Sequence, residues 1–245
     1  MDCGVLYQIS FFLRKSFCQI FDIISYMKAT YRQLPIPLPT IRRYPIYLRA
    51  IKSKIAGGEL YVSSAVLAEE LGFDPVLSRK DLAMAGVPGK PRRGYPAVTL
   101  CEAINRALGW DNPIQAALIG VGSLGSALLG YSGFEEQNLS ITAAFDASAA
   151  ATGRRVHGVK VRAMADLPSM VSQLNLSIGI ITVPSSAAQD CADRLIAAGI
   201  KAIWNFAPIQ LSVPKNVTVQ NVDLAQSLAV LSHSISVGES SDGSF

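Results

Sequence analysis

From residue 113 onward, short apolar runs alternate with segments whose apolar residues recur at helical spacing. The first run, residues 114–119, predicts a strand, and further strands are predicted over residues 140–145, 159–161, 178–183, 201–204 and 217–222. Helices are predicted over residues 167–174 and 185–198, the second closed by Gly199. Strands that alternate with helices in this way favour a parallel, doubly wound α/β sheet.

The first half of the chain has a different order, with three helices, a basic loop and a linking helix. The predicted elements are a helix over 41–56 that Thr40 caps and Pro45 kinks or delays, a short capped helix over 63–71, a helix from Pro75 to about 85 that Asp74 caps, a glycine-bounded loop at 89–95 and a linking helix over 99–109. Helix, short helix, turn, helix and basic hairpin is the order of a winged helix-turn-helix.

These patterns divide the chain into an N-terminal extension, a winged-helix domain, a doubly wound domain and a C-terminal helix with its tail. The predicted boundaries are residues 1–38, 39–112, 113–222 and 223–245. Arg14, Lys15 and Asp22 interrupt the apolar start, so no run reaches the roughly 18–20 residues that a membrane span needs. We expect no membrane association, and we interpret residues 1–26 as lying outside the functional fold, with Met27 as the candidate true start.

The strand over 114–119 ends in a glycine motif. Gly120, Gly122 and Gly125 form Gly-x-Gly-x-x-Gly before a predicted helix. In this setting the first glycine permits a tight turn, the second lets the backbone approach a pyrophosphate, and the third lets the helix pack closely on the strand. The N–H groups at the start of the helix also favour phosphates. Asp146, 21 residues past Gly125, can accept both hydroxyls of an adenosine ribose.

Parallel sheets bind ligands at the carboxyl ends of their strands, which places three more segments beside this motif and predicts an NAD(H) site. The predicted contacts are Gly120, Val121, Gly122, Ser123, Leu124, Gly125, Asp146, Thr182, Val183, Pro184, Asn205 and Phe206. Two alternatives stay open: a glycine-rich turn in another α/β domain, and Asn205 and Pro184 as a turn former and a strand terminator. Asp146 would repel a 2′-phosphate and so favours NAD(H) over NADP(H), although Arg154 and Arg155 nearby weaken that inference.

The charge distribution indicates a second partner. The formal net charge is +4, but residues 27–112 carry 13 Lys/Arg against 7 Asp/Glu, and residues 113–245 carry 7 against 9. A basic half on a helix-turn-helix pattern favours a DNA-binding face over an ordinary solvated face. The predicted DNA contacts are Arg43, Ser63, Ser64, Arg79, Lys80, Lys90, Arg92 and Arg93.

The chain offers little for catalysis or metal binding. Its four cysteines have no metal or redox spacing, which suits buried apolar thiols in a reducing cytosol. The two histidines, His157 and His233, form no evident His–Asp pair, and there is no Tyr-x-x-x-Lys beside the expected cleft. We therefore predict no metal site and no catalytic residue, which disfavours the alternative of an NAD-dependent dehydrogenase.

Over about residues 39–236 the chain resembles the Rex family of redox-sensing transcriptional repressors. The matching segments are residues 47–49, 62–64, 79–82, 94–95, 120–125, 145–146, 182–184, 198–201, 205–208 and 223–225. The resemblance implies a winged helix-turn-helix domain followed by a Rossmann-type doubly wound domain, with a C-terminal helix that swaps onto the partner subunit.

The resemblance also implies a function. It predicts a cytoplasmic homodimer that binds inverted-repeat operator DNA, reads the NADH/NAD⁺ ratio and is released by NADH. Leu224 would lie near the partner's nicotinamide, and Arg49, Tyr95 and Asp223 match positions linked to the domain rearrangement.

Three segments depart from the family pattern. Residues 83–86 are Ala-Met-Ala-Gly instead of Ser-Tyr-Phe-Gly, and Arg92-Arg93-Gly94-Tyr95 stands for Gly-x-Gly-Tyr. Residues 147–149 lack the common second acid and proline. The departures predict a changed operator affinity and a weaker NAD(H) affinity, so the alternative function is an NAD-binding paralogue with weak or altered DNA binding.

Overall fold

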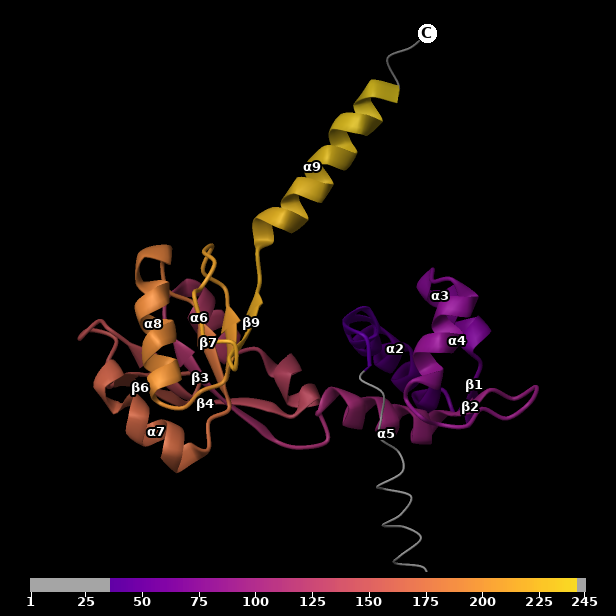
Figure 1. Ribbon diagram of the computed structural model, residues 1–245, viewed down its shortest axis with the longest axis horizontal. Helices are drawn as coiled ribbons and strands as arrows, with labels where there is room; N and C mark the ends of the chain where they lie inside the picture. Colours follow the sequence, from indigo (N-terminus) through magenta and orange to yellow (C-terminus); the bar gives the residue numbers. More distant parts are fainter. Residues whose placement is uncertain (1–35, 242–245) are drawn as a thin grey trace, which may run out of the picture. The chain divides into compact units, whose positions relative to one another are not determined.

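The computed structural model describes residues 36–241. The chain divides into two compact units, Met1–Leu108 and Gly109–Phe245, whose described parts are drawn in colour in Figure 1. The predicted N-terminal extension, including the segment 1–26 and Met27, lies outside the described residues except at its last positions.

The first unit contains four helices and a short antiparallel sheet within the described residues 36–108. Its elements are α2 (Leu38–Ala56), β1 (Tyr61–Val62), α3 (Ser64–Leu71), α4 (Pro75–Ala83), β2 (Tyr95–Pro96) and α5 (Ala97–Leu108). β1 pairs with β2 so that Val62 lies opposite Tyr95, and residues 89–95 form the wing that leads into β2. The helix order and the wing confirm the predicted winged helix-turn-helix.

Two of the three predicted helix caps are confirmed in this unit. Ser63 Oγ accepts the backbone N–H of Ala65 at 3.3 Å, and Asp74 Oδ1 accepts that of Leu77 at 2.8 Å. The prediction for Thr40 is wrong, because α2 begins at Leu38 and the Thr40 hydroxyl donates to Asp81 Oδ1 at 2.8 Å. A tertiary partner therefore uses the hydroxyl that the sequence offered as a cap.

Pro45 lies inside α2 without ending it, since the helix is continuous from Leu38 to Ala56. The buried side chains of Tyr44, Tyr47 and Ile51 pack this helix against the rest of the unit. We infer that this packing offsets the hydrogen bond that proline removes.

The helix α4 ends at Ala83, two residues earlier than predicted.

The second unit is built on a seven-stranded sheet in the order β5-β6-β4-β3-β7-β8-β9. The strands are β3 (Ile114–Ile119), β4 (Leu139–Asp146), β5 (Arg155–Val156), β6 (Val159–Ala163), β7 (Ile178–Ile181), β8 (Ala202–Asn205) and β9 (Thr218–Asn221). All pairs are parallel except the short β5–β6 hairpin, which the sequence did not predict. The six parallel strands follow the 3-2-1-4-5-6 order of a Rossmann-type sheet, as predicted.

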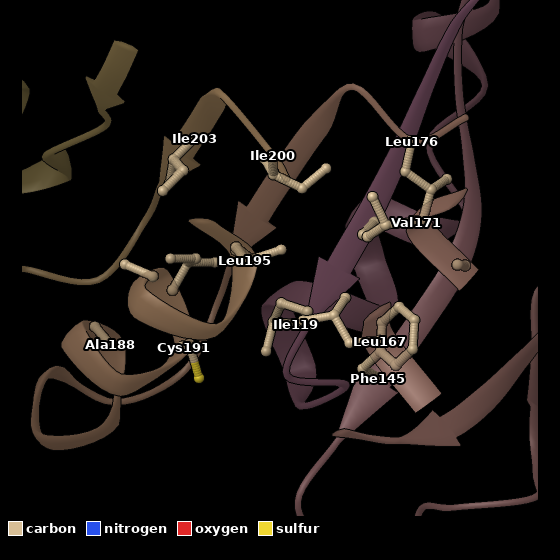
Figure 2. Close-up of a cluster of buried hydrophobic side chains, with 14 of the residues drawn as sticks. Ile119, Phe145, Leu167, Val171, Leu176, Ala188, Cys191, Leu195, Ile200 and Ile203 are labelled. Carbon is tan, nitrogen blue, oxygen red and sulfur yellow. The ribbon is translucent and has the colours of Figure 1, made fainter. Parts of the chain in front are cut away.

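Helices cover both faces of this sheet. They are α6 (Ser123–Leu129), α7 (Leu167–Leu174) and α8 (Ser185–Ala197), with 3₁₀ turns η1 (Ser132–Gln137) and η2 (Met164–Asp166). Figure 2 shows the core on one face, where Ile119 and Phe145 of the sheet meet Leu167 of α7 and Leu195 of α8. The other face packs against α6 and η1. The core therefore fixes the carboxyl ends of β3 and β4 from both sides.

The final helix, α9 (Leu224–Ser241), begins where it was predicted. Its apolar side chains are exposed in the single chain: Leu228 is 63%, Leu231 62% and Ile235 64% exposed. The backbone of Leu224 is described but its side chain is not, so the predicted contact of Leu224 lies outside the described residues. Within residues 36–241, no helix combines the length and the apolar character that a membrane crossing requires.

Candidate functional site

The glycine motif forms the turn between β3 and α6, and two of its glycines have no room for a side chain. Gly120 has φ +95°, and a Cβ there would lie 2.7 Å from Val183 Cγ1. A Cβ on Gly125 would collide with the carbonyl oxygen of Gly120 and lie 2.8 Å from Thr182 Oγ1. The first glycine therefore makes the turn and the third lets α6 approach β3 closely, as predicted.

Gly122 is different, because a Cβ built on it meets no atom within 4 Å. This glycine also lines a cleft of about 830 Å³ at the carboxyl end of the sheet. The fold does not need glycine at this position for packing. The missing side chain instead leaves the backbone open on the cleft side, which is what close approach of a pyrophosphate requires.

Asp146 is held at the end of β4 by two backbone N–H groups. Its Oδ2 accepts the N–H of Val121 at 2.7 Å, and its Oδ1 accepts that of Ser148 at 2.8 Å. An ionised carboxylate has about four acceptor positions, so about two stay available to a ligand. The same contacts join the glycine loop to the segment after β4, so Asp146 shapes the cleft that it lines.

The segment after β7 closes another side of the cleft. Thr182, Val183 and Pro184 all line it, as predicted. The Thr182 hydroxyl lies 2.7 Å from the carbonyl oxygen of Gly120 and 3.0 Å from that of Ile119. Thr182 therefore fastens the end of β7 to the glycine turn.

The sequence prediction missed the contribution of α8 to the cleft. Asp190, Cys191 and Arg194 line it, and Asp190 Oδ2 pairs with Arg194 Nε at 2.8 Å. Burial raises the pKa of the Cys191 thiol, with a smaller contribution from Asp190, so the thiol stays protonated. These residues continue the face of α8 that begins at Ala187, and that i, i+3, i+4, i+7 spacing was the signal available in the sequence.

Asn205 and Phe206 do not line the cleft. The buried Asn205 side chain donates to the carbonyl oxygen of Ile209 at 2.9 Å and to Asn221 Oδ1 at 2.8 Å, and accepts the N–H of Ala207 at 3.0 Å. Phe206 packs on Trp204 with ring centroids 5.1 Å apart. This geometry favours the alternative that Asn205 organises the turn after β8.

In the first unit, α4 has one buried and one exposed face. Ser78, Asp81 and Leu82 are buried, whereas Arg79 and Lys80 are exposed. Ser63 and Ser64 at the start of α3 are half-buried, and the wing residues Lys90, Arg92 and Arg93 are exposed. The predicted set is thus spread over α3, α4 and the wing of one small unit.

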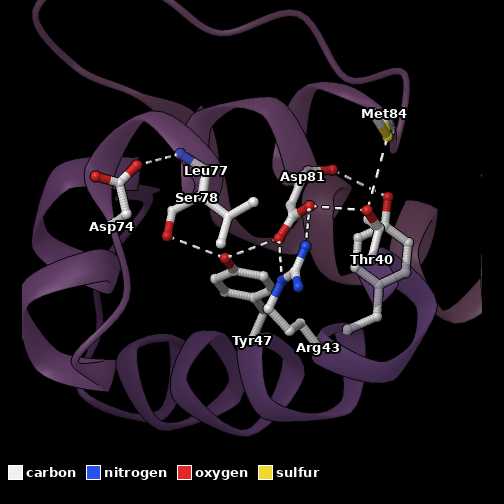
Figure 3. Close-up of polar contacts among 9 residues, drawn as sticks. Thr40, Arg43, Tyr47, Asp74, Leu77, Ser78, Asp81 and Met84 are labelled. Carbon is white, nitrogen blue, oxygen red and sulfur yellow. Dashed lines mark hydrogen bonds and ion pairs between the residues drawn. The ribbon is translucent and has the colours of Figure 1, made fainter. Parts of the chain in front are cut away.

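Arg43 is the exception in this set, because its guanidinium is paired inside the unit (Figure 3). Its Nε and Nη2 donate to Asp81 at 2.6 Å and 2.9 Å, and Thr40 donates to the same carboxylate. The Tyr47 hydroxyl lies 3.2 Å from Asp81 Oδ2 and 3.0 Å from Ser78 Oγ. Asp81 thus ties α4 to α2, a role that the sequence prediction missed.

Ionisation in this network follows from its partners. Burial alone would raise the pKa of Asp81, but the hydrogen bonds from Arg43 and Thr40 outweigh it and the pKa is lowered. Burial, with Asp81 nearby, raises the pKa of Tyr44 to about 12. At neutral pH the carboxylate is therefore charged and the tyrosine is a neutral donor to the Asp81 carbonyl oxygen, 3.1 Å away.

The three predicted switch residues fall in both units. Arg49 is exposed on α2, Tyr95 is buried in β2, and Asp223 precedes α9, where its Oδ1 accepts the N–H of Ala225 at 2.9 Å. Their role in a rearrangement stays a prediction. No cluster of metal-ligating side chains occurs within the part of the chain that the structure describes.

Known protein families match both units. Residues 35–83 match the model of a putative DNA-binding protein N-terminus, and residues 111–209 match that of a CoA binding domain. Among solved structures, a Rex-family repressor called RSP, in complex with β-NAD⁺ and operator DNA, has a TM-score of 0.79 at 33% identity, covering 83% of this chain and 94% of that one. RSP with β-NADH has a TM-score of 0.75 at 32% identity, covering 84% and 97%.

Curated relatives agree with these structures. The redox-sensing transcriptional repressor Rex of Treponema denticola is 45% identical over 193 residues, 79% of this chain and 92% of the relative. Rex of Bacteroides fragilis is 38% identical over 204 residues, 83% and 93% of the two chains. Both relatives are named as transcriptional repressors. The chain therefore belongs to the Rex family of redox-sensing transcriptional repressors.

Proposed function

We propose that this chain is a homodimeric repressor that holds inverted-repeat operator DNA and is released by NADH. The observation that carries the proposal is the presence, in one chain, of the glycine cleft with Asp146 and of a winged helix with exposed cations on α4. The solved relatives support it, since RSP was crystallised with β-NAD⁺ and operator DNA and with β-NADH.

The cleft residues fit NAD(H). Gly122 leaves room for a pyrophosphate, and Asp146 keeps acceptor positions for the hydroxyls of the adenosine ribose. The negative charge of Asp146 disfavours the 2′-phosphate of NADP(H). Within residues 36–241 Arg155 forms no ion pair with Asp146, and its Nη1 instead donates to the carbonyl oxygen of Gly158 at 2.7 Å. Bound NAD(H) supplies a redox signal here, and the residues of this chain bind it and transmit its presence.

The exposed face of α4 determines which residues are proposed to contact DNA. A recognition helix places its exposed residues in the major groove, and Arg79 and Lys80 lie on that face. A symmetric dimer presents two such helices about one helical turn, roughly 34–36 Å, apart, so the operator is an inverted repeat. A repressor of this kind acts in the cytoplasm, where the operator DNA is.

The apolar residues of α9 support the dimer. Leu228, Leu231 and Ile235 are all exposed and recur at i, i+3 and i+7, so they form one contiguous apolar side of the helix, whereas exposed apolar residues of a monomer are usually scattered. A partner subunit that covers them would remove this apolar surface from water. A swapped α9 would also place Leu224 on the partner's dinucleotide domain.

The test is fluorescence anisotropy with the full chain and an inverted-repeat duplex, titrated with NADH and separately with NAD⁺. NADH must bind one state of the repressor better than the other, so NADH and not NAD⁺ should release the duplex. A random duplex is the control for non-specific binding. Equal affinity for both duplexes would favour the paralogue with altered DNA binding, and oxidation of NADH by 2-oxo acids would favour a dehydrogenase.

A further inference from the structure

The wing is a tight loop closed at its base. The Lys90 N–H donates to the carbonyl oxygen of Gly94 at 2.7 Å, and the Gly94 N–H donates back to that of Lys90 at 2.9 Å. Gly94 has φ +88°, and a Cβ there would collide with the backbone of Val62. The base of the wing is therefore packed directly on β1, Arg93 closes onto it through its N–H donated to the Lys90 carbonyl oxygen at 3.1 Å, and Pro91 and Arg92 lie at the tip.

Two of the three wing cations gather on one aromatic ring of β1. Lys90 Nζ donates to the Tyr61 hydroxyl at 2.9 Å and lies 5.2 Å from the ring centroid. Arg93 Cζ lies 5.6 Å from the same centroid. Both distances are within the range of cation–π attraction. The hydrogen bond from Lys90, followed by the charges of both cations, lowers the pKa of Tyr61.

Arg92 differs from the other two wing cations, Lys90 and Arg93, in backbone conformation and in side-chain contacts. Its φ is +61°, in the left-handed region that an L side chain disfavours and that glycine adopts without penalty. Within residues 36–241, the Arg92 guanidinium makes no hydrogen bond, ion pair or ring contact, and the residue is exposed. A strained backbone that carries a long cation at a loop tip is typical of a position where the side chain serves binding and not folding.

We propose that the wing cations divide their work: Tyr61 is a positioning residue that holds Lys90 and Arg93 at the wing base, and Arg92 at the tip is the wing cation that contacts DNA phosphates. The inference rests on the proposed DNA-binding function and deepens it. The sequence alone predicts the same role, a DNA contact, for all three wing cations. Arg92 is suited to this contact because its guanidinium has no partner to give up within the described chain.

The first experiment compares Arg92→Gly and Arg92→Asn with Arg106→Gln in the full chain. Arg106 is exposed on α5, so its variant is the control for losing one surface charge. Binding of the inverted-repeat duplex is measured from about 50 to about 200 mM KCl, where the logarithm of affinity falls linearly with that of salt. Each lost phosphate contact lowers that slope by about one, so both Arg92 variants should lower it by about two per dimer.

The fold should not suffer from these changes. Glycine and asparagine tolerate a left-handed φ better than arginine, so hydrogen exchange of β1 and β2 should be unchanged or slower in both Arg92 variants. A slope for Arg92→Gly equal to the parent's, or to that of Arg106→Gln, would overturn the proposal. If the parent itself does not prefer the inverted repeat, the proposed function fails and not this inference alone.

The second experiment tests the role of Tyr61. Tyr61→Phe keeps the ring and loses the hydroxyl contact with Lys90, whereas Tyr61→Leu loses both. Tyr61→Leu should weaken DNA binding and Tyr61→Phe should retain most of it. The loss of DNA affinity caused by Arg92→Gly should also be smaller in the Tyr61→Leu background. A wing that Tyr61 no longer holds would place Arg92 less often within reach of a phosphate. Strictly additive effects of the two changes would contradict the positioning role.

Discussion

Removing the Asp81 carboxylate should loosen α4 from α2. The side chain is 2% exposed and accepts hydrogen bonds from Thr40 at 2.8 Å and from Arg43 at 2.6 Å and 2.9 Å. Asp81→Ala leaves the donors of Arg43 and Thr40 without this acceptor, whereas the Tyr47 hydroxyl keeps Ser78 Oγ at 3.0 Å. The substitution therefore combines a lost ion pair with polar groups that water cannot fully reach.

The expected size follows from burial. Deleting one partner of a buried ion pair costs about 3–5 kcal/mol. The Arg43 side chain is 21% exposed, so water compensates part of the loss and the lower end of that range applies. A destabilisation of about 3 kcal/mol corresponds to a roughly 150-fold larger opening equilibrium for α4.

Hydrogen exchange of the full chain, read by peptide, is the suitable assay, because a chain with two units need not unfold in one step. Peptides of α4 should exchange roughly 150-fold faster in Asp81→Ala, and peptides of β7 in the other unit serve as the internal reference. Asp81→Asn keeps the shape and one acceptor, so its effect should be smaller. Exchange of α4 within about threefold of the parent would refute the reasoning, since that is less than 1 kcal/mol.

The pH dependence has a defined sign. The pKa of Asp81 is lower in the folded chain than the ordinary carboxyl value near 4, so its stabilisation is present above that value. The stabilisation is lost as the pH falls through the folded pKa. The difference in α4 exchange between parent and Asp81→Asn should therefore be full at neutral pH and shrink at pH values below about 4.

Three further predictions concern the cleft and the recognition helix. Asp146→Ala should weaken NADH binding about ten- to hundredfold in a calorimetric titration, and Asp146→Asn should weaken it less, because a hydrogen bond to a charged group contributes about 1.5–3 kcal/mol. Gly125→Ala should destabilise the second unit because its Cβ collides with Gly120, whereas Gly122→Ala should fold normally and still lose NADH affinity; equal melting temperatures for the two variants would contradict this. Arg79→Ala should lower the preference for the inverted repeat over random duplex in anisotropy titrations, and an unchanged preference would remove Arg79 from the DNA contacts.

Sequence reasoning succeeded where the signal is local. The glycine turn, the caps at Ser63 and Asp74 and the strand–helix alternation each depend on residues within one or two turns of chain. The placement of Asp146 also followed, because parallel strands end at the same edge of a sheet. The first three features depend on local sequence, and the placement of Asp146 depends on a general rule of parallel sheets.

It failed where a side chain finds a partner far along the chain. Thr40 has the chemistry of a cap, but its hydroxyl bonds Asp81, 41 residues away. For Asn205 the sequence leaves a ligand contact and a turn former both open, and its amide donates to Asn221 Oδ1, 16 residues away. A polar side chain offers the same donors and acceptors to any neighbour, and only the tertiary fold decides which neighbour it meets.

The Asp81 network allows two components of DNA affinity to be measured separately: the sequence-independent attraction to phosphates and the preference for the inverted repeat. Arg79 and Lys80 are exposed because Ser78 and Asp81 on the same helix are buried, so the contact that fixes α4 also aims its cations. Asp81→Asn removes one negative charge per chain and therefore cannot weaken the sequence-independent attraction to phosphates. If the Asp81 contacts orient α4, this variant should bind random duplex at least as tightly as the parent. Its preference for the inverted repeat over random duplex should nevertheless be smaller. A loss of affinity equal for both duplexes would instead mean that the unit has unfolded, which the exchange of α4 would show directly.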